Sequence, residues 1–499
     1  METVPEKIYK NYIGKAINKY SAIEQLISLT ENSDNMVIRI DCIKALEKIG
    51  VLEEKVFTFF ENLLISDTNE IIRINAAKCI KNLFLNRALN PMTWALEHES
   101  SIKVLITAVK SLGEIKVSSS KSILIDEINK IKNQKYKKCL SDLFKNKKIE
   151  YFNNDELAEI LVNYLIVNYF EKKYDQVDFE LINGLIKELA LYYFNINKSN
   201  VLKVVPEFIN NLKALKKLDL KIHKIKAIPA SIDSLTSLIY LDLSYNKLKY
   251  LPESICYLKS LKFLYLRYNN LISIPSSIGS LKSLKVLDLR ANKLKSLPSS
   301  ITNMTSLKVL DVHGNHIEEL PESIGSLTSL KKLDVGLNNL KHLPESMQNL
   351  NSLKSLGLGG NKLLKILPEW INSFSSLNEL HLNDNNLESL PESIGSLIPL
   401  KILNLRNNQL KELPKSFKSL TSLKNLDLSW NNFSYLPDWI DSLIFLEEIN
   451  LWGNNLDSLP KSIANLPSLK ILNLHYNKFN DDLPNFLKNS KLKGLMVSR

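Results

Sequence analysis

A single pattern returns every 23 residues along the second part of this 499-residue chain, and no other feature restricts the fold so strongly. The pattern is L-x-x-L-x-L-x-x-N-x-L-x-x-L-P-x-x-I-x-x-L-x-S. Its copies begin at Leu215, Leu238, Leu261, Leu284, Leu307, Leu330, Leu353, Leu377, Leu400, Leu423, Leu446 and Leu469, and a last fragment begins at Leu492. One copy cannot bury its apolar residues alone, so the copies are expected to stack into a solenoid with one continuous core.

Each position of the repeat has a physical role, which the copy from Leu307 illustrates. Leu310 and Val312 are expected to point inward from a short strand, while Asp311 faces outward. Pro321 ends the pairing and starts the descending segment of the repeat. The asparagine that closes the strand can satisfy backbone groups of the loop with its side chain. It recurs at Asn246, Asn269, Asn292, Asn315, Asn338, Asn361, Asn385, Asn408, Asn431, Asn454 and Asn477, whereas the first copy has His223.

The repeat with its LPxxIxxL segment resembles the leucine-rich repeats of the intracellular Ras-group proteins and of disease-resistance-like repeat domains. The resemblance implies an α/β horseshoe whose parallel strand ladder lines the concave face. It also implies a non-catalytic cytoplasmic scaffold that binds a protein partner, with small GTPases or their regulators as one class of partner.

The first 145 residues follow a different pattern, which predicts paired helices. Val37–Gly50 and Ile71–Phe84 share a V/I-I-R-I-x-x-x-K motif, and a looser copy spans Ser101–Ile115. Each copy follows another amphipathic helical segment, and this recurrence resembles HEAT repeats, an all-α solenoid. Asp34 before Arg39, and Asp67 before Arg73, fit the acid–base ladder that is common in that family.

These patterns divide the chain into three predicted segments. Residues 1–145 form a HEAT-like α-solenoid, residues 146–214 a helical linker and cap, and residues 215–499 the leucine-rich-repeat domain. The cap is predicted to contain helices over Asp155–Lys173 and Phe179–Tyr193, followed by a degenerate repeat that covers the open end of the core.

The composition and the motifs of the chain exclude several classes of function. No apolar run is long enough to span a membrane, the N-terminus lacks the apolar segment of a secretion signal, and Cys42, Cys79, Cys139 and Cys256 are scattered. The glycines of the stretch LGLGG fall on repeat positions, and no Lys-Ser/Thr pair completes a phosphate loop. We therefore expect no enzyme, no cofactor and no metal. The net charge of +12 leaves a nucleic-acid-associated protein as the alternative, which aspartates on the concave face disfavour.

Aromatic residues on the outward positions of adjacent repeats predict a contact patch for a protein partner. Tyrosine and arginine are enriched at the energetic centres of interfaces, although aromatic residues also suit strand surfaces in general. The predicted centre consists of Tyr240, Phe263, Tyr265, Arg267, Tyr268 and Arg290.

Two further groups of outward residues are candidates for the same partner. Asp288, Asp311 and Asp334 stack on successive repeats, and they form either an acidic stripe for a basic partner or ordinary L-D-L filler of the repeat. Trp430 and Trp452 lie several repeats farther along and predict a second aromatic group.

Overall fold

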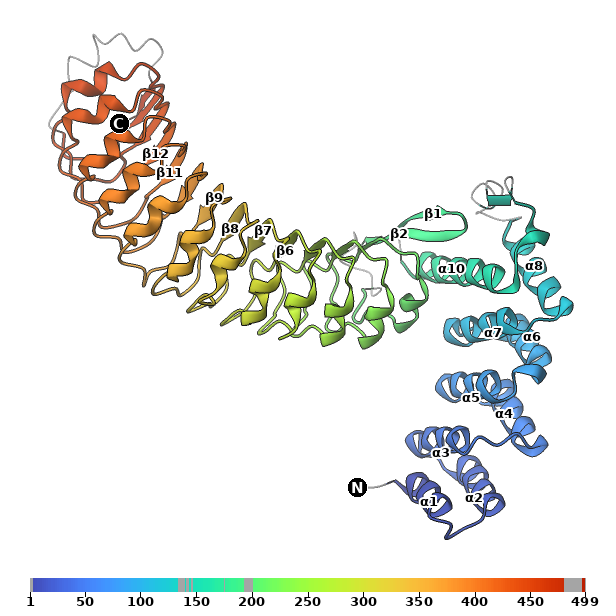
Figure 1. The fold of residues 1–499 in the computed structure, drawn as a ribbon. Coiled ribbons are helices and arrows are strands. Elements are labelled where there is room, and N and C mark those ends of the chain that lie inside the picture. Colours follow the sequence, from blue (N-terminus) through green and yellow to red (C-terminus); the bar gives the residue numbers. More distant parts are fainter. Residues whose placement is uncertain are drawn as a thin grey trace. The chain divides into compact units, whose positions relative to one another are not determined.

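The computed structural model describes residues 3–132, 140, 143–144, 147–174, 176–192, 201–479 and 496–498. It divides the chain into two compact units, Met1–Leu189 and Ala190–Arg499. The first unit contains the blue and turquoise helices of Figure 1, and the second contains the strands from green to red. Cys139, Asn200 of the predicted cap and the start of the predicted repeat fragment, residues 492–495, lie outside the described residues.

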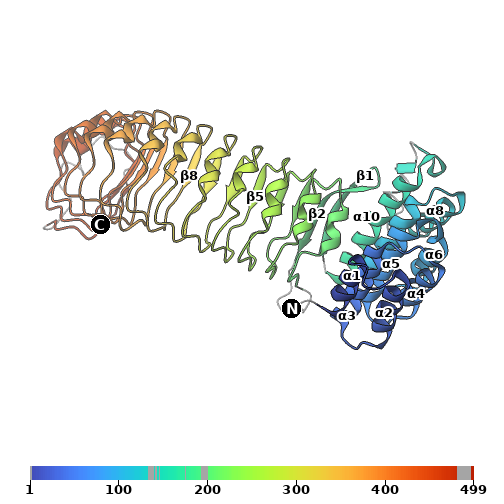
Figure 2. The same ribbon diagram turned by 60° about the horizontal axis from the view of Figure 1, so that its bottom comes forward.

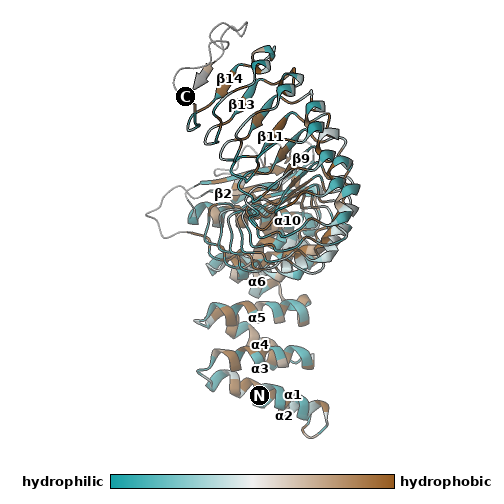
Figure 3. Cartoon of the chain, turned by 90° about the vertical axis from the view of Figure 1, so that its left-hand side faces the viewer, coloured by the Kyte–Doolittle hydropathy of each residue, from teal (hydrophilic) through white to brown (hydrophobic). Residues whose placement is uncertain are grey.

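The first unit is built from α-helices that pack as successive pairs. Their bounds are α1 Val4–Ile13, α2 Lys19–Asn32, α3 Met36–Ile49, α4 Glu54–Ser66, α5 Glu70–Leu83, α6 Leu89–His98, α7 Ile102–Glu114, α8 Ser118–Lys132 and α10 Asn154–Lys173. The three copies of the sequence motif are α3, α5 and α7, which pack side by side, and α10 packs next on α7. Both hydrophilic and hydrophobic segments are visible along these helices in Figure 3, as expected for helices with one buried side.

Local side chains determine where these helices begin. Asn35 accepts the backbone N–H groups of Val37 and Ile38, at 2.9 and 3.4 Å, and Asn69 accepts that of Ile71 at 2.8 Å. Asparagine is a favourable residue at this position because its short side chain satisfies N–H groups that have no partner inside the helix.

A ladder of ion pairs connects neighbouring helix pairs. Arg39 contacts Asp67, and the Arg73 Nε lies 2.7 Å from the Glu99 carboxylate. Each arginine therefore pairs with the acid that precedes the next copy of the motif. Burial opposes ionisation of Glu99, but hydrogen bonds from Arg73 and from the Ser101 backbone hold the pKa of Glu99 below its ordinary value.

The segment after α10 corrects one prediction. The helix predicted over Asp155–Lys173 is confirmed as α10, but the helix over Phe179–Tyr193 is wrong: strands β1 (Gln176–Ile182) and β2 (Leu185–Tyr192) occupy that segment. Asn183 and Gly184 have φ angles of 53° and 75° between the strands. Positive φ at both residues is the requirement of a two-residue hairpin turn, which the Asn-Gly pair meets at little cost.

The second unit is a ladder of parallel strands in chain order. The strands are β3 Lys217–Asp219, β4 Tyr240–Asp242, β5 Phe263–Tyr265, β6 Val286–Asp288, β7 Val309–Asp311, β8 Lys332–Asp334, β9 Ser355–Gly357, β10 Glu379–His381, β11 Ile402–Asn404, β12 Asn425–Asp427, β13 Glu448–Asn450, β14 Ile471–Asn473 and β15 Met496–Ser498. Leu310 pairs with Leu333, one repeat ahead, and the same register holds along the ladder. Figure 2 shows these strands side by side.

Each proline of the repeat precedes a short 3-10 helix, such as η5 (Glu253–Tyr257) after Pro252. In Figure 1 the repeat unit curves, with the strands along its inner side and the 3-10 helices along its outer side. The inner side is called the concave face below. Leu310, Val312 and Ile317 are fully buried between these two layers, as predicted for the core of the solenoid.

The asparagine ladder runs through the whole repeat unit and joins each repeat to the next. Asn338 is 5% exposed, accepts the backbone N–H of Ile317 at 2.9 Å, and donates to the carbonyls of Val312 and Val335, both at 3.0 Å. In the first repeat, the Nε2 of His223 lies 3.1 Å from the Leu191 carbonyl. The predicted architectural role of this column is confirmed.

Candidate functional site

The aromatic patch predicted from the sequence forms on two adjacent strands of the concave face. Tyr240 pairs with Phe263 across β4 and β5, and their ring centroids are 6.3 Å apart. The Tyr240 ring also lies 5.3 Å from the Tyr265 ring. One residue cluster therefore covers both strands, because parallel in-register pairing places equivalent positions side by side.

A second layer of the patch lies where the strands end. The rings of Tyr245 and Tyr268 stack at 4.5 Å and are nearly parallel, with an interplanar angle of 10°. The Arg267 guanidinium lies 5.5 Å from the centre of the Tyr245 ring. The aromatic patch consists of Tyr240, Phe263, Tyr265, Tyr245 and Tyr268 together with Arg267.

The backbone beneath Tyr245 and Tyr268 is strained, a feature that sequence reasoning missed. The residue before each ladder position has a positive φ in every full repeat: Ile222, Tyr245, Tyr268, Ala291, Gly314, Leu337, Gly360, Asp384, Asn407, Trp430, Gly453 and Tyr476. Glycine, asparagine and aspartate adopt this conformation at low cost, whereas bulky residues there are genuine outliers. Tyr245 and Tyr268 are nevertheless 42% and 47% exposed, so burial of their rings does not explain them.

The two arginines of the predicted site have different environments. The Arg290 Nη2 lies 2.5 Å from the Asp311 carboxylate, and this hydrogen bond raises the pKa of Arg290. Arg267 occupies the same position one repeat earlier, and it has no carboxylate partner among the residues that the structure describes. Arg267 is therefore the arginine of the two whose charge is available to a binding partner.

The three aspartates of the predicted stripe bind their own loops. Asp288, Asp311 and Asp334 each accept the backbone N–H of the residue two positions on, all at 3.1 Å. Asp311 lies on the outward side, as expected, but it is only 5% exposed. Burial raises the pKa of Asp288, and the neighbouring Asp311 raises it further. The sequence does contain a signal for this role, because aspartate is a residue type that commonly accepts the backbone N–H two residues further along a loop.

Burial also acts on the tyrosines beside this stripe. It raises the pKa of Tyr240 and of Tyr265, and the carboxylate of Asp242 adds to both shifts. The Tyr240 hydroxyl donates to the Asp242 carboxylate at 3.4 Å. Both phenols are therefore neutral hydrogen-bond donors at physiological pH.

The second aromatic group lies at the other end of the concave face and is independent of the aromatic patch. The rings of Trp430 and Trp452 are 5.6 Å apart, and those of Trp452 and Tyr476 are 5.9 Å apart. Trp430 is 46% exposed and Tyr476 is 76% exposed. Both have positive φ, as Tyr245 and Tyr268 do.

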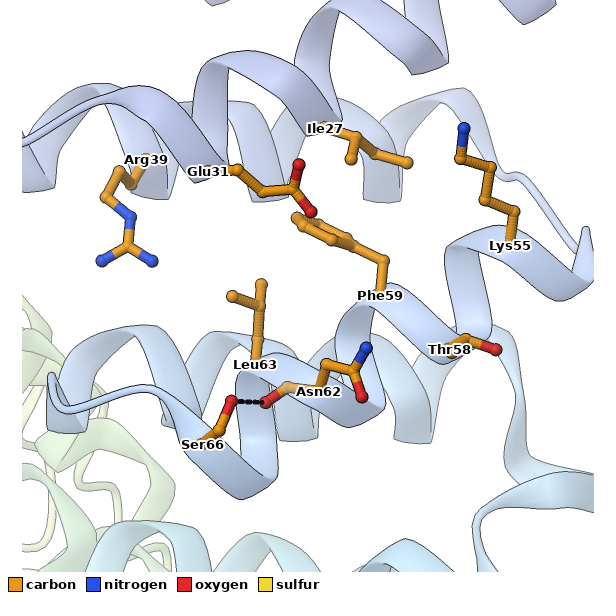
Figure 4. A pocket seen from close by; sticks show the side chains of 9 residues that line it. All are labelled: Ile27, Glu31, Arg39, Lys55, Thr58, Phe59, Asn62, Leu63 and Ser66. Atoms are coloured by element: carbon orange, nitrogen blue, oxygen red, sulfur yellow. Dashed lines mark hydrogen bonds between the residues drawn. The ribbon is translucent and has the colours of Figure 1, made fainter.

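The helical unit contains a groove between α2 and α4, which Figure 4 shows from close by. Its volume is about 580 Å³, and its floor includes Ile27, Phe59 and Leu63, which are almost fully buried. Of its charged lining residues, Lys55 pairs with Glu24 at 2.6 Å and Arg39 contacts Asp67. Both basic side chains of its lining are therefore engaged in ion pairs.

Two further observations concern the described part of the chain. No group of three or more His, Cys, Asp or Glu side chains within it is placed to hold a metal ion. None of its helices combines the length and the apolar character that crossing a membrane requires.

Comparisons with known proteins agree with this geometry. A family model of the leucine-rich repeat region matches residues 246–317, 303–389 and 379–485. A leucine-rich-repeat protein of Leptospira interrogans is 36% identical, with 60% of this chain and 76% of that chain covered and a TM-score of 0.57. An internalin of Listeria monocytogenes is 22% identical over 62% of this chain and 86% of that chain, with a TM-score of 0.53, which shows the fold alone. No curated protein sequence matched the chain.

Proposed function

The chain belongs to the leucine-rich-repeat family, and from this premise we propose that it is a non-catalytic scaffold that binds a protein partner on the concave face of its repeats. Leucine-rich repeats generally serve as interaction modules, because stacked repeats present an extended and rigid concave surface. The proposed energetic centre is the aromatic patch.

One observation carries this proposal: exposed tyrosines occupy backbone positions that glycine or asparagine would occupy with less strain. Tyr245 and Tyr268 have φ angles of 57° and 53°. Gly314 and Asn407 hold the equivalent positions of other repeats. Ile222 and Leu337 share this conformation outside the patch, so it belongs to the repeat as a whole. Tyr245 and Tyr268 differ because their exposed rings stack on each other beside Arg267, and this exposed aromatic surface supports a role in binding.

The chemistry of the aromatic patch suits a protein surface. Tyr240, Phe263 and Tyr265 supply apolar area on rigid strands, which limits the entropy lost on binding. Arg267 supplies an unpaired guanidinium beside two stacked phenol rings. Large aromatic and arginine anchors at the centre of a patch are the residues that dominate interface energies.

The class of partner is a finer proposal that rests on the resemblance to Ras-group repeats. We propose a small GTPase or one of its regulators as the partner, in the cytoplasm. The aspartates along the concave face oppose the phosphate backbone of a nucleic acid, which supports a protein partner over the nucleic-acid alternative.

The test compares variants of the aromatic patch with a matched aromatic control. The wild-type chain captures its partner from native lysate, and mass spectrometry identifies that partner. The dissociation constant of the purified pair is then measured for wild type and for Tyr265→Ala/Arg267→Ala. We expect the double variant to lose more than about 2 kcal/mol, or roughly thirtyfold in affinity, with its circular dichroism unchanged.

Tyr257→Ala is the control, because Tyr257 is 63% exposed but belongs to the 3-10 helix η5 on the outer side. This variant should bind as wild type does. Equal affinities of wild type and the double variant would refute the proposed centre. If the partner is a GTPase, its affinity should also differ between its GDP and GTP forms.

A further inference from the structure

A shallow hollow lies on the concave face across strands β10 to β13, away from the aromatic patch. Its volume is about 150 Å³. That is the room of about five water molecules, well below the roughly 300–1,000 Å³ of pockets for drug-sized ligands. Its polar lining consists of His381, Asn404, Asn425, Asp427, Glu448 and Asn450. The hollow has room for one small ring.

Contacts inside the protein use one end of each amide in the hollow. The Oδ1 of Asn404 accepts the Arg406 N–H at 3.0 Å, and the Oδ1 of Asn450 accepts the Trp452 N–H at 3.2 Å. Asn425 instead donates its Nδ2 to a Glu448 oxygen at 3.0 Å. Within the described part of the chain, the Nδ2 groups of Asn404 and Asn450 and the Oδ1 of Asn425 have no hydrogen-bond partner.

The two carboxylates each keep one oxygen available. The Oδ1 of Asp427 accepts the Ser429 N–H at 2.9 Å and its hydroxyl at 2.5 Å. The Oδ2 of Asp427 and the Oε1 of Glu448 accept no hydrogen bond from any described residue. The hollow therefore presents donors and acceptors next to one another.

This mixture discriminates between classes of ligand. A lysine or arginine side chain would pair with the carboxylates but would oppose the amide N–H groups, because it carries donors only. A phosphate or carboxylate would be repelled by Asp427 and Glu448. A hydroxyl both donates and accepts, so neighbouring hydroxyls on one small ring satisfy both kinds of group.

An aromatic surface adjoins the hollow. Trp452 follows Asn450 by two residues, and Leu451 between them is fully buried, so both side chains lie on the outward side. Trp430 lies 5.6 Å from Trp452, centre to centre. Its position with φ of 55° is strained for so large a side chain. The exposed ring of Trp430 and the half-buried ring of Trp452 provide flat apolar surfaces for the C–H faces of sugar rings.

We propose that this end of the concave face is a saccharide-binding site. One pyranose ring occupies the hollow through its hydroxyls, and the next ring of an oligosaccharide packs against Trp430 and Trp452. The site goes beyond the proposed protein partner, because it uses other strands and another chemistry.

The test uses the full chain and three defined probes: cellotetraose, chitotetraose and mannotetraose. Calorimetric titration and tryptophan fluorescence should show saturable binding of at least one of them. Trp430→Asn and Glu448→Gln should each weaken that binding by about tenfold. Asn407 already occupies the position equivalent to Trp430, so asparagine fits the backbone there. Circular dichroism confirms that each variant is folded.

Two controls separate the outcomes. Tyr265→Ala/Arg267→Ala alters the aromatic patch and should leave sugar binding unchanged, so the two sites can fail independently. No saturation with any of the three probes would overturn the proposal. The proposal would also be overturned if neither Trp430→Asn nor Glu448→Gln weakened the binding of the sugar. Binding of the peptide Arg-Lys-Arg-Lys without binding of any of the sugars would overturn it as well.

Discussion

Replacing Asn338 by alanine should destabilise the repeat unit by about 2–6 kcal/mol. The side chain accepts the Ile317 N–H at 2.9 Å, and this N–H makes no other hydrogen bond to the described residues. A buried donor without a partner costs about 1–3 kcal/mol. The carbonyls of Val312 and Val335 each lose one donor but keep another, from Asn315 and Asn361. Each such lost bond adds about 0.5–1.5 kcal/mol.

The assay is unfolding in guanidinium chloride followed by tryptophan fluorescence. Trp370, Trp430, Trp439 and Trp452 belong to the repeat unit, so the signal reports mainly on it. Hydrogen exchange at the Ile317 amide should accelerate in the same variant. Asn339→Ala is the matched control, because Asn339 is exposed and its side chain makes no hydrogen bond to the described residues, so it should change stability by less than about 0.5 kcal/mol. Equal stabilities of the two variants would refute the bridging role of the ladder.

Three further changes test the remaining arguments. Leu310→Ala should cost about 2–5 kcal/mol in denaturant unfolding, because it opens a cavity in a fully buried core. Asp288→Asn keeps the hydrogen bond to the Arg290 N–H. Because burial raises the pKa of Asp288, the wild type loses stability as the pH rises through that pKa, so the variant should have a higher melting temperature at pH 7 and an equal one near pH 3. A lower melting temperature of the variant at pH 7 would contradict this. Arg73→Ala should cost about 1–3 kcal/mol in thermal unfolding of the helical unit, because Glu99, whose side chain is 5% exposed, loses its ion-pair partner.

The repeat unit could be predicted from the sequence because its period, its inward leucines and its asparagine column all require the same ladder. The paired helices were predictable for a related reason, since each motif copy is amphipathic at helical spacing. The segment Phe179–Tyr193 was not predicted correctly. Its apolar residues suit a helix as well as a strand, and only the Asn183-Gly184 pair favours a hairpin.

The candidate site was predictable only in part. Strand periodicity places Tyr240, Phe263 and Tyr265 on one face, and the structure brings their rings together. Periodicity does not show that Arg290 pairs with Asp311, because an ion pair depends on the distance between two side chains in the folded protein, which the sequence does not give. The strain at Tyr245 likewise depends on a backbone conformation that becomes visible only in three dimensions.

Site-specific photo-crosslinking tests the central claim most directly. A photoreactive phenylalanine analogue replaces Tyr265 on the concave face or Tyr257 on the outer side, and each protein is irradiated with its purified partner. We predict a crosslinked complex from position 265 and none from position 257. Crosslinking from position 257 alone would show that the partner does not dock on the concave face.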